Sequence, residues 1–171
     1  MSKKFKKPIL LVVLICFFVF SILFYQSYLW RFFVKDGQVV KLVLKDNFFA
    51  NQGKQLSVEV VKNENSTRRG LSNRSRLETA DGQKLDGMLF IFSEAKIRYF
   101  WMKDMQFDID ICWLKEQSIL DCTRRALKPD VENDEDLFVY QSPQAVDLVL
   151  ETMPDFLTRE LLGSKLYLKL F

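Results

Sequence analysis

The sequence predicts a mainly β protein: a compact antiparallel β-sandwich or barrel with two short helices, preceded by one N-terminal transmembrane helix. Three observations support this. Residues 9–25 are apolar except for Ser21. Several later segments alternate apolar and polar residues with the period of two that half-buried strands show. Turn-forming residues separate these segments at short intervals, so strands adjacent in sequence should pair in an antiparallel sandwich or barrel.

Charge and composition exclude some function classes. The chain has 171 residues, enough for one domain plus an extension. Residues 1–35 hold six of the 25 basic residues and none of the 22 acidic ones, so the rest has 19 basic and 22 acidic residues, a net charge of −3. Nucleic-acid binding needs a basic surface and is not expected. The chain contains no His, which removes His bases, His metal ligands and Ser-His or Cys-His catalytic pairs.

The N-terminus divides into a basic tail over residues 1–8 and a signal-anchor helix over residues 9–30. As a helix, residues 9–30 would span about 33 Å, enough to cross a bilayer. Tyr25, Tyr28 and Trp30 form an aromatic belt at one end. Four lysines precede the span, so the positive-inside rule predicts a single-pass protein with a cytoplasmic N-terminus and an extracytoplasmic domain. The expected partner of this segment is the lipid bilayer.

Three alternatives for this segment fit less well. A cleaved signal peptide has a shorter apolar region and a small-residue cleavage site. A lipoprotein signal needs a small residue before Cys16, where the chain has Ile15. A core helix of a small domain would have one polar face, whereas this segment would be apolar on every face of the helix.

Residues 31–54 form a connector and a first strand, and residues 55–171 form the globular β domain. Residues 55–62 alternate Leu56, Val58 and Val60 with polar positions, as a half-buried strand does. A short helix capped by Ser66 or Thr67 follows and runs toward Arg74. Its arginines either form a solvated face or turn inward to bind a carboxylate or phosphate; they are Arg68, Arg69, Arg74 and Arg76.

The most apolar part of the domain is residues 87–114. Residues 88–92 are apolar on both faces, which predicts a central strand. In the next strand, Trp101 and Lys103 share one face. In the strand over residues 107–114, Asp108 and Asp110 share a face. A buried carboxylate costs several kcal/mol unless it is paired, so Asp110 should meet an Arg, a Lys or backbone donors.

Five short motifs in this region resemble the domain of unknown function 192 family, over about residues 55–170. They are Arg69-Gly70-Leu71 with Arg74, Gly87-Met88-Leu89-Phe90, Phe100-Trp101-Met102-Lys103, Asp110-Ile111 and Val149-Leu150-Glu151. The chain departs from the family pattern at Asp104-Met105, where Asn-Thr is usual, at Asp108, where Pro is usual, and at Thr152-Met153-Pro154, where small residues and Gly are usual. The resemblance implies a compact β-sandwich or barrel that is often exported, with no assigned activity.

The hairpin after residue 114 decides how two cysteines face each other. A three-residue loop, residues 116–118, places Cys112 opposite Cys122. A two-residue loop pairs Cys112 with Asp121 instead. Export permits oxidation, so Cys112 and Cys122 are a possible disulfide, and the alternative is two buried free thiols.

The C-terminal third is predicted to hold an acidic loop, short strands and one helix. The loop over residues 128–136 lacks the Gly and final Glu of a calcium-binding EF-hand and is expected to be solvated. Strands follow over residues 137–140 and 146–151. Residues 154–162 read as a short helix that stops at Gly163, and the last strand covers residues 165–171. No metal or other cofactor is expected.

Three functions remain open. The preferred one is a membrane-anchored, ligand-binding or accessory envelope protein that takes a small-molecule or glycan-like ligand and is not an enzyme. Its candidate ligand-binding residues are Arg69, Arg74, Met88, Trp101, Lys103 and Asp110, with a shallow pocket formed by Trp101, Lys103, Asp110 and Arg74. The second is an envelope hydrolase that uses Asp104, Asp108 or Asp110 as acid and base. The third is a structural partner that docks another envelope protein through a flat apolar patch.

Overall fold

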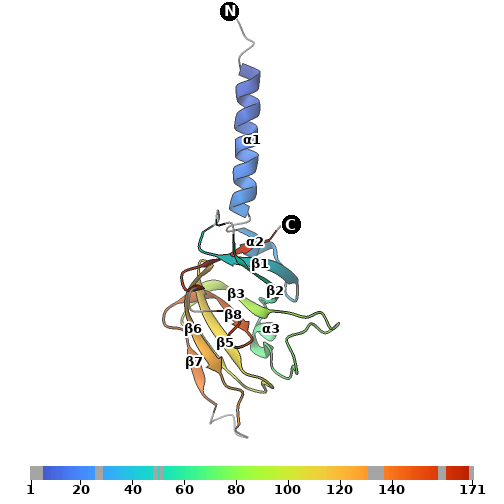
Figure 1. The fold of residues 1–171 in the computed structure, drawn as a ribbon, viewed down its shortest axis with the longest axis vertical. Coiled ribbons are helices and arrows are strands. Elements are labelled where there is room, and N and C mark those ends of the chain that lie inside the picture. Colours follow the sequence, from blue (N-terminus) through green and yellow to red (C-terminus); the bar gives the residue numbers. More distant parts are fainter. Residues whose placement is uncertain are drawn as a thin grey trace, which may run out of the picture.

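The domain is a closed barrel of seven strands with a small second sheet beside it (Figure 1). This computed structural model describes residues 6–25, 29–47, 50, 52–130, 137–157 and 161–169, with side chains from residue 9 onward. The barrel order is β1-β2-β3-β8-β5-β6-β9, and β4 pairs with β7 in the second sheet. The strands are β1 (Val39–Lys45), β2 (Lys54–Val61), β3 (Gly87–Lys96), β4 (Tyr99–Trp101), β5 (Ile109–Lys115), β6 (Ser118–Ala126), β7 (Val139–Gln141), β8 (Val146–Thr152) and β9 (Lys165–Leu168).

The predicted mainly β fold is confirmed, but one strand pair runs against the expected antiparallel pattern. β2 and β3 are parallel, with Val58 opposite Gly87 and Val61 opposite Phe90. A parallel pair needs a long crossover, and the segment between these strands supplies it. That crossover contains helix α3 (Glu64–Arg69) and lies against the outside of the barrel.

The helices also differ from expectation. α3 begins one turn earlier than predicted, because the Asn63 side chain, not Ser66 or Thr67, accepts the capping hydrogen bond, from the Ser66 N–H at 2.8 Å. It ends at Gly70 rather than near Arg74. The helix predicted over residues 154–162 is wrong at its start, since residues 154–157 form turns and bends and Asp155 has a φ of 62°. Residue 161 has a 3-10 helical conformation and residue 162 lies in a turn, and residues 158–160 lie outside the described residues. A four-residue helix, α2 (Trp30–Phe33), was not predicted.

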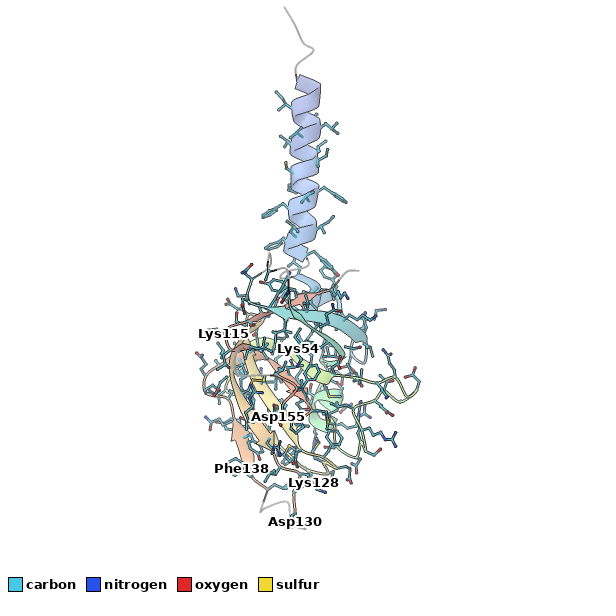
Figure 2. The ribbon with its side chains drawn as sticks, viewed as in Figure 1. Lys54, Lys115, Lys128, Asp130, Phe138 and Asp155 are labelled. Atoms are coloured by element: carbon cyan, nitrogen blue, oxygen red, sulfur yellow. A yellow bond between two sulfur atoms is a disulfide. The ribbon has the colours of Figure 1, made fainter. Side chains whose placement is uncertain are left out.

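Helix α1 (Lys6–Phe24) precedes the barrel and projects from one end of it (Figure 1). Its side chains extend on all sides of the helix axis (Figure 2). Within the described part of the chain, no helix combines the length and apolarity that a membrane crossing requires. The span predicted over residues 9–30 also includes residues 26–28, which lie outside the described residues.

The connector between α1 and the barrel is attached to strand β8. Arg31 of α2 forms an ion pair with Asp147, and the other oxygen of Asp147 accepts a hydrogen bond from the Glu116 N–H at 2.9 Å. Trp30 is fully buried among residues of the barrel interior. The connector is therefore part of the folded domain.

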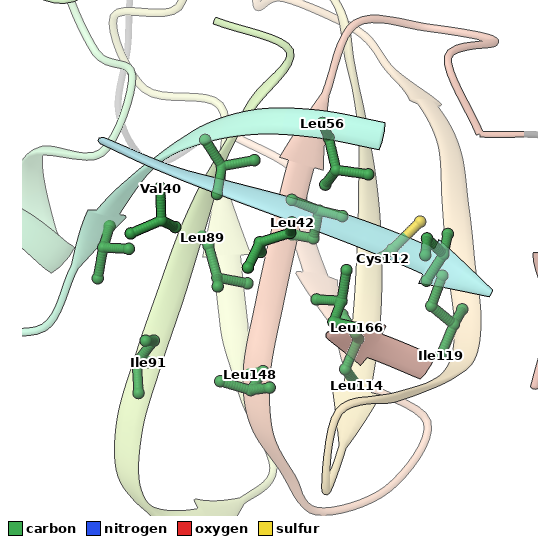
Figure 3. Close-up of a cluster of buried hydrophobic side chains, with 14 of the residues drawn as sticks. Val40, Leu42, Leu56, Leu89, Ile91, Cys112, Leu114, Ile119, Leu148 and Leu166 are labelled. Carbon is green, nitrogen blue, oxygen red and sulfur yellow. The ribbon is translucent and has the colours of Figure 1, made fainter. Parts of the chain in front are cut away.

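Residues 87–91 of β3, 109–114 of β5 and all of β8 are buried, as predicted for the central strand over residues 88–92, of which only Phe92 is partly exposed. One face fills the barrel interior, where Leu89, Cys112 and Leu148 meet side chains from β1, β2 and β9 (Figure 3). The other face lies under the crossover and the segment around β4, in an outer cluster that includes Phe90 and Trp113. This double burial explains why these segments are largely apolar rather than alternating, with Asp110, Asp147 and Glu151 as their buried acids.

The β5–β6 hairpin has the loop length of one alternative considered from the sequence and the cysteine pairing of the other. Its loop has two residues, Glu116 and Gln117, with φ of 49° and 73°. Leu120 is then an extra residue in β6, because Leu114 pairs with Ile119 and Trp113 with Asp121. That bulge restores Cys112 opposite Cys122, and the structure joins these two residues in a disulfide.

Candidate functional site

A cavity of about 320 Å³ lies on the outer face of the barrel, between the end of α3 and the segment that leads into β4. We call it the Glu151 pocket. Its base is formed by strand β3 and by Glu151 of β8, and its rim by the turn after α3 and by residues 97–101. The lining residues are Thr67, Arg68, Arg69, Gly70, Leu71, Ser72, Phe90, Phe92, Ile97, Arg98, Tyr99, Phe100, Trp101, Met105 and Glu151.

Glu151 is the unusual residue of this pocket. It lies in a strand whose residues are all buried, between Met88 of β3 and Ile111 of β5. Its Oε2 has no hydrogen-bond partner among the described residues. Burial raises the pKa of Glu151 to about 8, against the smaller opposing effect of Arg74. The carboxyl is therefore mostly protonated near neutral pH.

Three arginines surround the pocket entrance. Arg68 and Arg69 are exposed at the end of α3, and Arg98 comes from the segment before β4. None of the three forms an ion pair within the part of the chain that the structure describes. The rim is therefore cationic above an uncharged acid.

Arg98 is held by contacts that leave part of its guanidinium available. Its guanidinium lies 3.7 Å from the centre of the Phe92 ring, and its Nη2 donates to the Glu94 carbonyl at 2.7 Å. The Arg98 Nε is buried and has no partner among the described residues. The neighbouring carboxylate of Glu94 is paired with Lys96 instead. Burial lowers the pKa of Arg98 from its usual value, because desolvation disfavours the charged form.

Aromatic rings form the apolar side of the pocket. Phe90 and Phe100 meet edge to face at 4.9 Å, and Phe100 meets Trp113 in the same way at 5.6 Å. Gly70 lets the chain turn closely over these rings, because its φ is 50° and a Cβ there would lie 3.3 Å from the Phe90 ring. The result is a rigid apolar wall beside the two unpartnered polar groups.

The predicted ligand-binding residues are divided among several places. Arg69 and Trp101 line the Glu151 pocket. Lys103 lies 5.8 Å from the Trp101 ring and lines an adjoining groove of about 270 Å³ with it. Met88 is fully buried in the outer cluster, beside Glu151 in the sheet.

Arg74 and Asp110 line neither cavity and have structural partners instead. Arg74 donates two hydrogen bonds to Glu59, at 2.7 and 3.0 Å. Of the two alternatives considered for the arginines, Arg74 therefore takes the inward one, and the carboxylate it binds is the protein's own. Asp110 accepts hydrogen bonds from the Arg124 side chain at 2.9 Å and the Arg125 N–H at 2.8 Å, as predicted for a buried carboxylate. The shallow pocket predicted from Trp101, Lys103, Asp110 and Arg74 is thus not assembled.

The aspartates considered for hydrolysis do not meet in one cavity. Asp108 accepts a hydrogen bond from the Lys128 N–H at 2.9 Å, and Asp110 is held as described. Asp104 lies in a turn with a φ of 57° and lines the adjoining groove. The arrangement offers no pair of carboxylates facing a shared space among these three residues.

Sequence reasoning did not select Glu151 or Arg98. A signal for Glu151 was present, because this acid ends the apolar run Leu148-Val149-Leu150 and belongs to the Val149-Leu150-Glu151 motif. Arg98 had no such signal, since its role depends on the rings and strands that the fold brings around it.

Comparisons with known proteins agree on the fold. The model of the DUF192 family, described as an uncharacterised ACR, matches residues 47–164. A search of curated proteins finds no match. A crystal structure from Sinorhizobium meliloti 1021, described as a proposed transcription regulator, has 22% sequence identity and a TM-score of 0.58, and covers 78% of this chain and 95% of its own. A protein of unknown function from Novosphingobium aromaticivorans DSM 12444 has 18% identity and a TM-score of 0.58, covering 75% of this chain and 84% of its own.

Proposed function

Because the chain belongs to the DUF192 family, which has no assigned activity, we propose its function from the site: a membrane-tethered barrel that binds a small ligand in the Glu151 pocket. One observation carries this proposal. Glu151 is a buried acid whose Oε2 has no partner among the described residues, and it lies in a cavity that also holds Trp101 and Arg69. Buried polar atoms are nearly always hydrogen-bonded. A ligand that bonds Glu151 would satisfy this atom.

The pocket has the composition expected of a ligand site. Such sites are mostly apolar, with a few polar groups that fix the orientation of the ligand. Here the apolar part is the aromatic wall, and the polar groups are Glu151, Arg98 and the α3 arginines. The aromatic faces suit a sugar-like or ring-containing molecule, in keeping with the small-molecule or glycan-like partner expected from the sequence.

The test of ligand binding is a thermal-shift screen of the full chain in a non-ionic detergent. The compounds are sugars, sugar acids, organic acids and nucleotides. A ligand that binds only the folded state raises the melting temperature by mass action. Trp101→Ala removes an exposed wall of the pocket, and Phe138→Ala is the matched control, because Phe138 is 70% exposed and lies at the barrel end away from α1 (Figure 2). A shift that Phe138→Ala keeps and Trp101→Ala loses supports the proposal, and no shift with any compound would overturn it.

The tether proposal concerns residues 9–30 and an extracytoplasmic location for the barrel. It is supported by the exposure of α1, whose apolar side chains from Ile9 to Phe20 are between 47% and 70% exposed. A helix that is apolar on every face needs an apolar surrounding. After alkaline extraction of membranes the native chain should stay in the pellet, and a variant with Val12→Lys, Leu14→Lys and Phe18→Lys should be released. Recovery of the native chain in the supernatant would refute the tether.

A second candidate function, docking of another protein, rests on exposed apolar side chains at β4 and β7, a surface that adjoins the Glu151 pocket at Tyr99. Tyr99 and Val139, on the paired strands β4 and β7, are 65% and 48% exposed, and the neighbouring Phe138 is 70% exposed. Contiguous exposed apolar residues are typical of protein-docking surfaces. Crosslinking in membranes through a photoreactive residue at position 138 would report such a partner. The absence of any crosslinked product would count against this candidate.

A further inference from the structure

Within the proposed binding function, on which this inference rests, the chemistry of the Glu151 pocket specifies a class of ligand. We infer that the pocket takes small organic anions that carry a second, uncharged oxygen. The arginines of the rim bind the carboxylate or phosphate group of the ligand, and the neutral Glu151 carboxyl donates a hydrogen bond to its hydroxyl or carbonyl oxygen.

The first argument is the charge of the lining. Among the lining residues, Arg68, Arg69 and Arg98 are basic and Glu151 is the acid. With Glu151 protonated, the described lining is cationic and has no carboxylate to neutralise it. Guanidinium groups bind carboxylates and phosphates through paired hydrogen bonds. An anionic group at the rim is therefore the complementary partner.

The second argument is the position of the two unpartnered polar atoms. Glu151 of strand β8 and Arg98 of the segment that forms the rim both line the pocket, and each carries one buried polar atom, Oε2 and Nε respectively, without a partner among the described residues. A protonated carboxyl can donate one hydrogen bond and still accept others. A ligand with an anionic group at one end and a hydroxyl or carbonyl at the other can satisfy both atoms at once.

The third argument is size. The cavity volume of about 320 Å³ is at the lower end of the range of roughly 300–1,000 Å³ found for ligand pockets. The aromatic wall leaves little room for further polar contacts. The pocket therefore suits a compact acid, such as a sugar acid or a hydroxy acid, better than a nucleotide.

The groups around Glu151 define how binding depends on pH. Strands β3 and β5, on either side of Glu151, place Met88 and Ile111 next to it, and neither residue titrates. Ionisation of Glu151 would remove the hydrogen-bond donor and place a negative charge beside the anion. The affinity should therefore fall as the pH rises past 8. The other titratable or charged groups around the site are Arg68, Arg69, Arg98 and Tyr99 at the rim and Arg74 of the crossover with its partner Glu59. Three further carboxylates act on the rim arginines: Glu94 and Asp147 on Arg98, and Asp36 on Arg69.

The experiment measures binding of D-glucuronate, mandelate and 3-phosphoglycerate to the full chain in non-ionic detergent at pH 6.5 and pH 9, by calorimetry. D-glucose and phenylacetate are the comparison compounds, since they lack the charge and the hydroxyl respectively. At least one of the three anions should bind, and its affinity should fall about tenfold by pH 9, as expected if only the protonated form binds. Glu151→Gln keeps a hydrogen-bond donor and cannot ionise, so its affinity should stay within about threefold across this range. Glu151→Leu should bind weakly at both pH values.

Arginine variants test the other end of the ligand. Arg98→Gln should reduce the affinity at least tenfold. Arg76→Gln is the matched control, since Arg76 has a 75% exposed side chain outside the pocket lining and should bind as the native chain does.

The outcomes separate the two proposals. No binding of the three anions overturns this inference, and the proposed binding function falls with it only if the thermal-shift screen also shows no stabilising compound. Equal binding of glucose and glucuronate, or binding of the anions that has the same pH profile in the native chain and in Glu151→Gln, overturns the inference and leaves the binding function standing. If the native chain binds phenylacetate as tightly as mandelate, the ligand hydroxyl contributes nothing, and the donor role of Glu151 is refuted.

Discussion

Replacing Glu151 by Gln should stabilise the folded protein, and the gain should grow with pH. The folded-state pKa of Glu151 is raised from 4.5 to about 8 by burial, so the folded chain holds this proton more tightly than the unfolded chain does. The stabilisation that comes from this tighter proton binding is therefore complete below pH 4.5 and is lost as the pH rises toward 8. The slope is about 1.4 kcal/mol of unfolding free energy per pH unit within that window. Between pH 5 and pH 8 the native chain should lose roughly 3 kcal/mol relative to Glu151→Gln.

Urea unfolding of the full chain in non-ionic detergent, followed by tryptophan fluorescence, measures this difference at pH 5, 6, 7 and 8. All other titrating groups are shared by the two proteins, so they cancel when the free energies of unfolding are subtracted. Glu151→Leu is a second comparison that lacks both the charge and the polar atom, and its difference from the native chain should rise in parallel with that of Glu151→Gln. If both differences stay constant within about 0.5 kcal/mol across this range, Glu151 titrates normally and is not a neutral acid in the folded state.

Three other substitutions test the fold around the pocket. Replacing Cys112 and Cys122 together by Ala should lower the free energy of unfolding by about 3 kcal/mol, because the disulfide closes a short loop in the unfolded chain. A reductant should have no effect on this variant. Equal stability of the native chain and the variant would mean that the two thiols are free. Asp110→Ala should cost about 3–5 kcal/mol in urea unfolding. Asp155→Asn, which removes the charge of an acid that is 80% exposed and tolerates the φ of 62° there, should change stability by less than about 1 kcal/mol. Similar costs of the two substitutions would contradict the difference in burial. Gly87→Ala should lower the melting temperature by several degrees, because a Cβ at this position would clash with a backbone oxygen of β8. A melting temperature equal to that of the native chain would show that β3 and β8 can separate at this point.

The strands could be predicted from the sequence because their patterns are local. The apolar run over residues 88–92 marked β3 as a central strand, and the alternation over residues 55–62 marked β2. The parallel pairing of β2 with β3 could not be predicted in this way, since it depends on how the crossover returns the chain. Likewise the register of the hairpin depends on Leu120, an extra residue that no pattern in residues 118–126 distinguishes.

The site was harder to predict than the fold because its residues are chosen by tertiary packing. Arg69 and Trp101 were selected from their types and do line the pocket. Arg74 was also selected, but Glu59 lies close enough to bind it, and that neighbour is visible only in the folded chain. Glu151 was not selected, because the sequence of β8, which also contains Asp147, does not show which of the two acids is paired in the folded chain.

The ion pair between Arg31 and Asp147 gives the N-terminal helix a mechanical connection to the interior of the domain. Asp147 and Glu151 belong to the same strand, β8, four positions apart, so they lie on the same side of the sheet. Helix α2 is also held by Lys62, whose Nζ donates to the carbonyls of Arg31 and Val34 at 3.1 Å, and by the burial of Trp30 in the barrel interior. A displacement of α2 would therefore act on the strand that holds the acid of the pocket as well as on the chain just after β2.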